Sequence, residues 1–314
     1  MTTLEGRAWQ ALAGIGGVGS RALWQVADYL FHYGMPASWL LRNPERAREA
    51  LKGVKGVPVL PDPAALANGE VGATGEGGAI LLHPLHPRFP RRISERRLQA
   101  PLPAVLYALG NLSLLEKRSI AIVGRRDAGS PALSIAEKLA AGLAAAGVHV
   151  TSGYAPGIDT AAHLGALRSG GATTVVLAEG LGSFQVRPDF KVHKTDENTL
   201  VLSQFPPQAR WAAFQAMARN KLVAGLVDAL VVIVSGPERD AGGRMSGTFD
   251  AAKSALRLGV PLFVTDPGAF PIPPAGNAAL IAKGARGWSP ASGAGPILDA
   301  LKSGDEITAQ KSLF

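Results

Sequence analysis

The fold is decided by the stretch Ile120-Ala-Ile-Val-Gly-Arg-Arg-Asp-Ala-Gly-Ser-Pro131. Residues 119–123 are apolar after the first one and rich in β-branched side chains, which predicts a buried parallel strand. Ser130 is a good N-cap and Pro131 suits a first helical turn, so we expect a helix over residues 132–146. Such a unit directs backbone N–H groups and the positive end of a helix dipole at one point above the sheet.

The loop between this strand and this helix carries two adjacent arginines, Arg125 and Arg126, which predict an anionic ligand such as a phosphate. Gly124 and Gly129 have the spacing of a P-loop, but Ser130-Pro131 stands where Lys-Ser/Thr is required. The loop also lacks the Gly-x-Gly-x-x-Gly pattern of NAD-binding folds. ATP hydrolysis and NAD binding are therefore disfavoured, and no cofactor is expected. The alternative interpretation is a structural turn with solvated arginines.

Composition sets the outer limits on fold and function. The chain has 314 residues, 47% of them hydrophobic, enough for one large α/β core and a small accessory domain. Zero cysteines exclude disulfides, zinc ribbons and thiol nucleophiles, and no metal site is expected. No apolar run approaches the ~20 residues of a membrane span, and the first residues lack a signal-peptide core. We therefore expect a cytoplasmic protein without a membrane partner.

The positive charge of the chain is unevenly distributed. The net charge is +8, and a basic zone between positions 86 and 126 is opposed only by Glu95 and Glu116. This zone contains His86, Arg88, Arg91, Arg92, Arg96, Arg97, Lys117, Arg118, Arg125 and Arg126. A basic zone beside a phosphate-type loop is typical of nucleic-acid binding, and an ordinary solvated face is the alternative.

Three segments are expected along the chain. Residues 1–62 predict a small helical domain of the SAM or helix-hairpin-helix type, with a glycine turn at Gly14-Ile-Gly-Gly-Val-Gly19. Its helices are expected at residues 9–13, 20–31 and 37–41, and the stretch 59–78 predicts a linker. Residues 63–290 predict the main domain, and residues 291–314 predict a short C-terminal tail.

The main domain alternates apolar strands with helices. Strands are expected at residues 120–123, 148–152, 174–178, 200–205, 230–235 and 262–265, and helices at 130–146, 158–169, 210–226 and 248–258. This alternation predicts an α/β fold with a doubly wound, mostly parallel sheet. Ligands of such sheets bind at the carboxyl ends of the strands.

The loop after the second of these strands, residues 151–163, adds glycines and polar groups at the same edge. Gly153 and Gly157 allow the backbone to approach a ligand, and Asp159 lies in the first turn of the following helix. Ser152, Asp159 and His163 also suggest a Ser/His/Asp hydrolase. However, Gly-x-Ser-x-Gly is missing and Asp159 lies on the same helix as His163, so a helix-terminus charge is favoured.

Two later segments bring further cations to this edge. Arg219 and Lys221 lie on a predicted helix that enters the cleft, where each suits a phosphate. Arg244 precedes a predicted helix start at Ser246-Gly-Thr248, which forms a second candidate anion site.

Seven motifs in a fixed order carry a family resemblance. They are Leu82-His-Pro-Leu-His-Pro-Arg-Phe-Pro90, Pro103-Ala-Val-Leu-Tyr-Ala-Leu-Gly-Asn-Leu112, Ile120-Ala-Ile-Val-Gly-Arg-Arg126, Ser152-Gly-Tyr-Ala-Pro-Gly-Ile-Asp-Thr-Ala-Ala-His163, Arg219-Asn-Lys-Leu-Val-Ala-Gly225, Ser246-Gly-Thr248 and Ala275-Gly-Asn277. Together they resemble the DNA-processing protein A family (DprA, also called Smf). The resemblance implies an extended Rossmann-like domain that binds single-stranded DNA, forms homodimers and helps to load RecA recombinase in natural transformation. It implies no catalytic residue.

The expected DNA- or phosphate-binding residues combine this resemblance with the loop analysis. They are Gly124, Arg125, Arg126, Gly153, Gly157, Arg219, Asn220, Lys221, Arg244, Ser246, Gly247 and Thr248. Tyr154 and Phe249 are candidates for stacking on bases, although burial is the expected fate of Phe249.

The chain also departs from the family pattern. Gly-Arg-Arg replaces the usual Gly-Ser-Arg, the segment Gly236-Pro-Glu-Arg-Asp-Ala-Gly-Gly243 is inserted, and the family's winged-helix-like C-terminal domain is not expected here. The glycine-rich segments also resemble the lonely-guy phosphoribohydrolases and lysine-decarboxylase-like proteins. In those enzymes a glutamate stands where this chain has Ala251, with Asp250 displaced by about 100° around the helix. Nucleotide hydrolysis is therefore the second hypothesis, and a nucleotide-binding sensor the third.

Overall fold

The computed structural model describes residues 3–54 and 78–302, which divide into two compact units. The first unit contains the chain up to Leu109 together with residues 179–184 and 202–210, and the second contains the rest. The predicted boundary at residue 62 and the predicted linker up to residue 77 lie outside the described residues. The domain limits therefore remain predictions.

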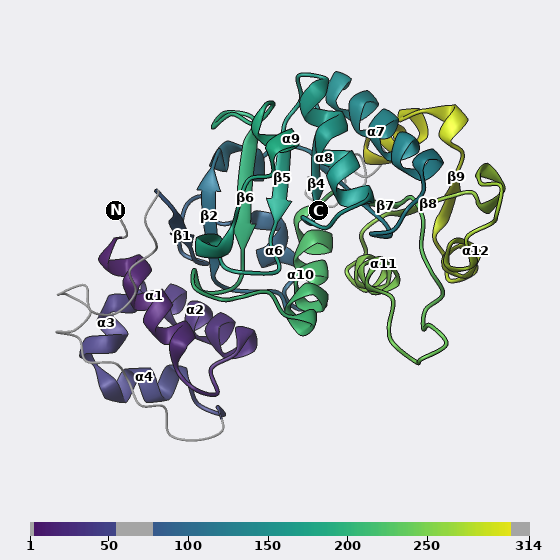
Figure 1. Ribbon diagram of the computed structural model, residues 1–314. Helices are drawn as coiled ribbons and strands as arrows, with labels where there is room; N and C mark the ends of the chain where they lie inside the picture. Colours follow the sequence, from purple (N-terminus) through teal and green to yellow (C-terminus); the bar gives the residue numbers. More distant parts are fainter. Residues whose placement is uncertain (1–2, 55–77, 303–314) are drawn as a thin grey trace. The chain divides into compact units, whose positions relative to one another are not determined.

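The first unit begins with the predicted helices (Figure 1). They are α1 (Leu4–Gly14), α2 (Ser20–Tyr33), α3 (Ala37–Arg42) and α4 (Pro44–Ala50), of which α4 was not predicted. The glycine turn joins α1 to α2, as expected. Trp9 and Trp24 are buried, and the Trp24 indole Nε1 donates a hydrogen bond to the Leu102 carbonyl at 2.9 Å. The helices α1 and α2 thus each bury a tryptophan of their own within the unit.

Two short strands complete the description of the first unit. β1 (Ile80–Leu82) pairs antiparallel with β2 (Leu106–Gly110), with Leu81 opposite Tyr107. The helix α6 (Arg91–Arg96) lies between them in the sequence and buries Ile93. Neither strand was predicted, because three to five residues carry too little periodicity to distinguish a strand from a loop.

A parallel sheet forms the centre of the second unit. Its hydrogen-bonded order is β5-β4-β3-β7-β8-β9. These strands are β3 (Ser119–Val123), β4 (His149–Ser152), β5 (Thr173–Val176), β7 (Ala229–Val232), β8 (Leu262–Thr265) and β9 (Arg286–Trp288), and β6 (Thr199–Ser203) is also a strand. Ile120 of β3 is paired with Val150 on one side and with Ala229 on the other. The chain thus builds the sheet outward in both directions from β3, which confirms the doubly wound prediction.

Helices cover both faces of this sheet, as Figure 1 shows for α7 and α8 on one side and α10 and α11 on the other. The helices of the unit are α7 (Ser130–Ala145), α8 (Ile158–Arg168), α9 (Pro188–Lys191), α10 (Ala213–Leu226), α11 (Gly247–Arg257) and α12 (Ala275–Ala282). One core cluster joins α7 and α8 to Ile120 and Ile122. Because β3 is buried on both faces, it is apolar throughout, as its sequence predicted.

Three expectations at element ends need correction. Ser130 is the first residue of α7, and Gly129 occupies the N-cap position without a side-chain bond. The helix α10 begins at Ala213 and not at residue 210, because Ala212 has an extended backbone. Part of the predicted tail is core, since Ile297 and Leu301 are buried against the sheet. Within residues 3–54 and 78–302, no helix is long and apolar enough to cross a membrane.

Candidate functional site

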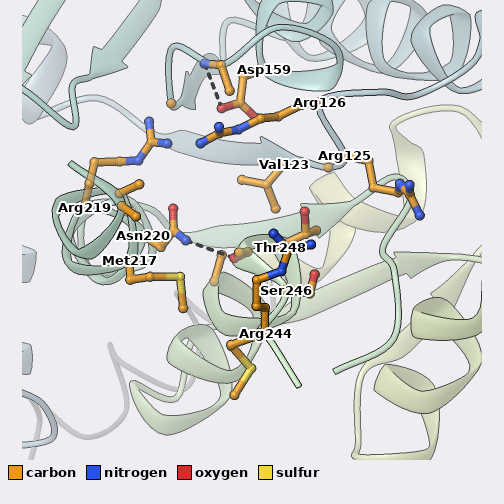
Figure 2. A pocket seen from close by; sticks show the side chains of 18 of the residues that line it. Val123, Arg125, Arg126, Asp159, Met217, Arg219, Asn220, Arg244, Ser246 and Thr248 are labelled. Carbon is orange, nitrogen blue, oxygen red and sulfur yellow. Dashed lines mark hydrogen bonds between the residues drawn. The ribbon is translucent and has the colours of Figure 1, made fainter. Parts of the chain in front are cut away.

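A cavity of about 810 Å³ opens at the switch point of the sheet in the second unit. At this point the chain continues from β3 to β4 on one side of the sheet and from β7 to β8 on the other. Figure 2 shows side chains entering it from the loop after β3, from α8 and α10, and from the segment before α11. Ten of the twelve predicted binding residues line it, namely Gly124, Arg125, Arg126, Gly153, Arg219, Asn220, Arg244, Ser246, Gly247 and Thr248. The topology therefore gathers loops that are more than 100 residues apart in the sequence.

Arg126 presents its guanidinium to this cavity. The side chain lies over the ring of Trp211, with the guanidinium carbon 5.7 Å from the ring centroid. It forms no salt bridge with any residue that the structure describes. The residue is exposed, so its charge is available to a ligand entering from solvent.

Arg125, in contrast, is paired within its own loop. Its Nε and Nη2 donate to the two carboxylate oxygens of Asp127 at 2.8 and 2.6 Å. The hydrogen bond from Arg125 is the main cause that lowers the pKa of Asp127 to about 2. Asp127 therefore stays charged at any physiological pH and neutralises Arg125 at the rim.

Arg219 forms the buried floor of the site together with Asp159. The Arg219 Nη1 donates to the Val176 carbonyl at 2.7 Å, and both charged side chains are 6% exposed. Burial raises the pKa of Asp159, and the nearby charge of Arg219 opposes this shift. The Arg219 Nε has no hydrogen-bond partner among the described residues. Arg219 is thus held by its Nη1 hydrogen bond, with its charge beside the buried Asp159 carboxylate.

Gly153 is required for this floor. A Cβ atom at Gly153 would overlap the Arg219 guanidinium and the Asp159 carboxylate. Gly153 was expected to let the backbone approach a ligand. In the structure it lets the backbone approach the side chains of Arg219 and Asp159. Whether it also contacts a ligand remains a prediction.

Two predicted residues, Gly157 and Lys221, do not line the cavity. Gly157 has φ +79°, and a Cβ there would lie 2.5 Å from the carbonyl oxygens of Arg125 and Arg126. Lys221 is half-buried on α10 and attracts the carboxylate of Asp250 instead. Gly157 thus packs against the backbone of the arginine loop. Lys221 is not among the residues that line the cavity.

The hydrolase alternative is not supported by the geometry. The Ser152 hydroxyl donates to the Ile122 carbonyl at 2.6 Å, away from His163. Burial lowers the pKa of His163 to about 4, so the ring is neutral. Its Nε2 donates to the Gly153 carbonyl at 2.5 Å, because a carbonyl can only accept, and its Nδ1 faces the Thr173 hydroxyl at 2.6 Å. His163 thus connects Gly153, after β4, to Thr173, at the start of β5, and among the described hydrogen bonds it has none with the Ser152 hydroxyl.

The phosphoribohydrolase alternative needs a carboxylate in the cavity at position 251. Among the described residues that line the cavity, this position is an alanine. Ala251 lines the cavity, whereas Asp250 is half-buried beside it with its Oδ2 unpartnered among the described residues. This placement agrees with the rotation of about 100° expected for neighbouring positions on a helix.

Several cavity residues were missed by the sequence analysis. Trp211 and Phe214, which line the cavity, are 51% and 72% exposed, and Arg239 also lines it. The two stacking candidates lie elsewhere, since Phe249 is fully buried and the Tyr154 hydroxyl accepts a hydrogen bond from the Arg187 amide at 2.9 Å. The sequence does contain a signal, because Trp211 and Phe214 precede Arg219. Two aromatic residues three positions apart also fit the buried face of an ordinary helix, so the pattern alone does not indicate a binding site.

Comparisons with known proteins agree with this geometry. The family model described as DNA recombination-mediator protein A matches residues 80–294. The chain is 37% identical over 131 residues to DNA processing protein DprA of Streptococcus pneumoniae, covering 41% of this chain and 46% of that protein. It is 30% identical over 190 residues to DprA of Bacillus subtilis, covering 60% and 62%. These alignments thus span less than two thirds of either relative.

Solved structures show the same fold. The X-ray structure of Streptococcus pneumoniae DprA superposes with a TM-score of 0.68 at 24% identity, over 92% of this chain and 96% of that one. A structure of DNA processing protein A from Helicobacter pylori, described in terms of its single-stranded DNA binding mode, matches with a TM-score of 0.57 at 25% identity, over 72% and 98%. The chain belongs to the DNA recombination-mediator protein A family, as its seven ordered motifs predicted.

Proposed function

We propose that the cavity at the β3–β7 switch point binds single-stranded DNA. The observation that carries the proposal is the gathering of five arginines and three aspartates around one cavity, which leaves an excess of two positive charges. The amino end of α11 adds backbone N–H groups at Gly247 and Thr248. Phosphate neutralisation by such a site makes affinity fall as salt rises.

Exposed aromatic rings favour unpaired bases as the second part of the ligand. Trp211 and Phe214 line the cavity, and more than half of the surface of each residue is exposed to solvent. Base stacking on aromatic rings is independent of sequence, and a duplex buries the faces of its bases. This arrangement supports a single strand as the ligand and does not favour a specific base sequence.

A salt titration with three ligands tests the proposal. Single-stranded DNA is expected to bind more tightly than duplex DNA of the same length, and both more tightly than a mononucleotide. Fluorescence anisotropy at several NaCl concentrations measures the affinities and the salt slopes. Mononucleotide binding as tight as strand binding would favour a nucleotide sensor, and release of adenine from AMP would favour hydrolysis. Either result, or no binding of the single strand, contradicts the proposal.

Removing Trp211 is expected to weaken single-strand binding without changing its salt dependence. Stacking contributes about 1 kcal/mol or more per base and involves no counterion release. The affinity of Trp211→Ala for single-stranded DNA should fall about fivefold, while Trp211→Phe retains most of it. Phe31→Ala, which removes an aromatic ring 80% exposed in the first unit, serves as the control. A Trp211→Ala variant with unchanged affinity would show that the ring does not contact bases.

We further propose that the protein acts in DNA processing by protecting single strands and passing them to RecA, as a homodimer. The family description, a recombination mediator, supports this role. The natural-transformation context is implied by the resemblance alone.

A further inference from the structure

Residues 238–246 form a hairpin in the second unit, overlapping the segment 236–243 that the sequence analysis expects to be an insertion. Arg239 and Met245 are bridged antiparallel, the Asp240 amide donates to the Arg244 carbonyl at 3.0 Å, and the Gly243 amide donates to the Asp240 carbonyl at 2.9 Å. Gly243 takes φ +76°, a conformation that favours glycine. The turn is therefore closed by its own backbone.

Ion pairs anchor the base of this hairpin. The Glu238 carboxylate lies 2.5 Å from the Lys253 ammonium of α11 and 3.6 Å from that of Lys283. The Ser246 amide donates to the Glu238 carbonyl at 3.0 Å, and the Ser246 hydroxyl caps α11 by accepting from the Phe249 amide. The hairpin thus begins and ends on groups that are fixed to α11.

Two guanidinium groups of the hairpin face the cavity. Arg239 and Arg244 both line it. Arg244 is held by Asp240, whose two oxygens accept from its amide and its Nε at 2.9 Å. Arg239 donates to the Gly243 carbonyl at 2.8 Å and forms no salt bridge in the part of the chain that the structure describes. In Figure 2, Arg244 and Arg126 lie on opposite sides of the cavity.

We propose that the hairpin of residues 238–246 is a second wall of the strand-binding site, whose Arg239 and Arg244 bind the phosphodiester next to the one bound by Arg126. This inference rests on the proposed function. Successive phosphates of a single strand are one nucleotide apart, so two cationic walls across one cavity engage neighbouring phosphates. The anchoring by Lys253, Lys283 and Asp240 fixes the wall before the ligand arrives, which lowers the entropic cost of binding.

The test compares Arg239→Ala/Arg244→Ala with Arg168→Ala/Arg286→Ala, which removes two guanidinium groups that do not line the cavity. Binding of an oligothymidylate is measured by fluorescence anisotropy across a range of NaCl concentrations. For single strands, the salt slope falls by about 0.7 for each phosphate that the protein no longer neutralises. Because Arg239 and Arg244 bind one phosphodiester, the slope of the hairpin variant should be smaller by about 0.7, and the control variant should keep the wild-type slope.

A hairpin variant with the wild-type slope, measured beside an Arg126→Ala variant with a reduced slope, overturns the inference and leaves the proposed function intact. Absence of single-strand binding by the wild type overturns both. Should the double variant unfold, Arg239→Gln provides the second measurement. It removes one exposed guanidinium and keeps the Asp240–Arg244 pair, so single-strand affinity should fall about threefold with a flatter salt slope. Unchanged affinity and slope of Arg239→Gln contradict the inference.

Discussion

Replacing Arg126 with alanine is expected to weaken single-stranded DNA binding by at least about tenfold. A charge-assisted hydrogen bond contributes about 1.5–3 kcal/mol, and 1.4 kcal/mol corresponds to a factor of ten. Arg126 is exposed and forms no salt bridge in the described ranges, so its guanidinium is available to a phosphate, although the buried Asp159 carboxylate also attracts it. Anisotropy titrations with two unrelated strand sequences should show equal losses, because a phosphate contact reads no base.

The matched control for this prediction is the double variant Arg125→Ala/Asp127→Ala. It removes a pair whose charges already cancel, with the Arg125 Nη2 and the Asp127 Oδ2 2.6 Å apart. Its affinity for the strand should stay within about threefold of the wild type, because an exposed salt bridge contributes little on its own. An equal loss in both variants would mean that the loop acts through its shape and not through the free charge of Arg126.

Replacing Gly157 with alanine is expected to destabilise the second unit by about 3 kcal/mol. Its backbone, with φ +79° and ψ −128°, is open to glycine and strained for any L side chain. The added Cβ would also lie 2.5 Å from the carbonyl oxygens of Arg125 and Arg126, which are backbone atoms and cannot rotate away. Urea denaturation measures the loss, and strand affinity should fall together with it because the arginine loop is displaced.

Gly147→Ala distinguishes these two causes. Gly147 has a similar φ of +74°, yet nothing lies within 4 Å of a Cβ built there. Only the backbone strain remains, so the free energy of unfolding should fall by about 1 kcal/mol and strand binding should be unchanged. If Gly157→Ala lowers the free energy of unfolding no more than Gly147→Ala does, the close approach to the arginine loop is not the reason that position 157 requires glycine.

Pairing of arginines with aspartates is a general property of this cavity. Arg125, Arg219 and Arg244 each have an aspartate nearby, which among the described residues leaves Arg126 and Arg239 with free charge, one on each proposed wall. The paired guanidinium groups are fixed in position and add little net charge to the cavity. We therefore expect most of the salt dependence to come from Arg126 and from the hairpin.

The long elements of the second unit were predictable because their patterns are strong. β3 is apolar on both faces, and α7 follows a loop with N-terminal helix signals, so both were located within two residues. Short elements such as β9 and α9 were not predicted, since three or four residues are too few to show a repeating apolar pattern. The start of α10 was placed three residues early because the extended backbone of Ala212 has no signal in the side chains.

The family, the doubly wound sheet and the loops that meet at its switch point could be predicted from local apolar periodicity and from ordered motifs. Which side chains face the cavity could not be predicted in this way and follows from the tertiary fold. It turned Lys221 toward Asp250, buried Phe249, placed Gly157 behind the arginine loop and brought Trp211 and Arg239 to the opening. The reason is physical: the direction of a side chain depends on the packing of distant segments around it, and one residue of helical rotation turns it by about 100°.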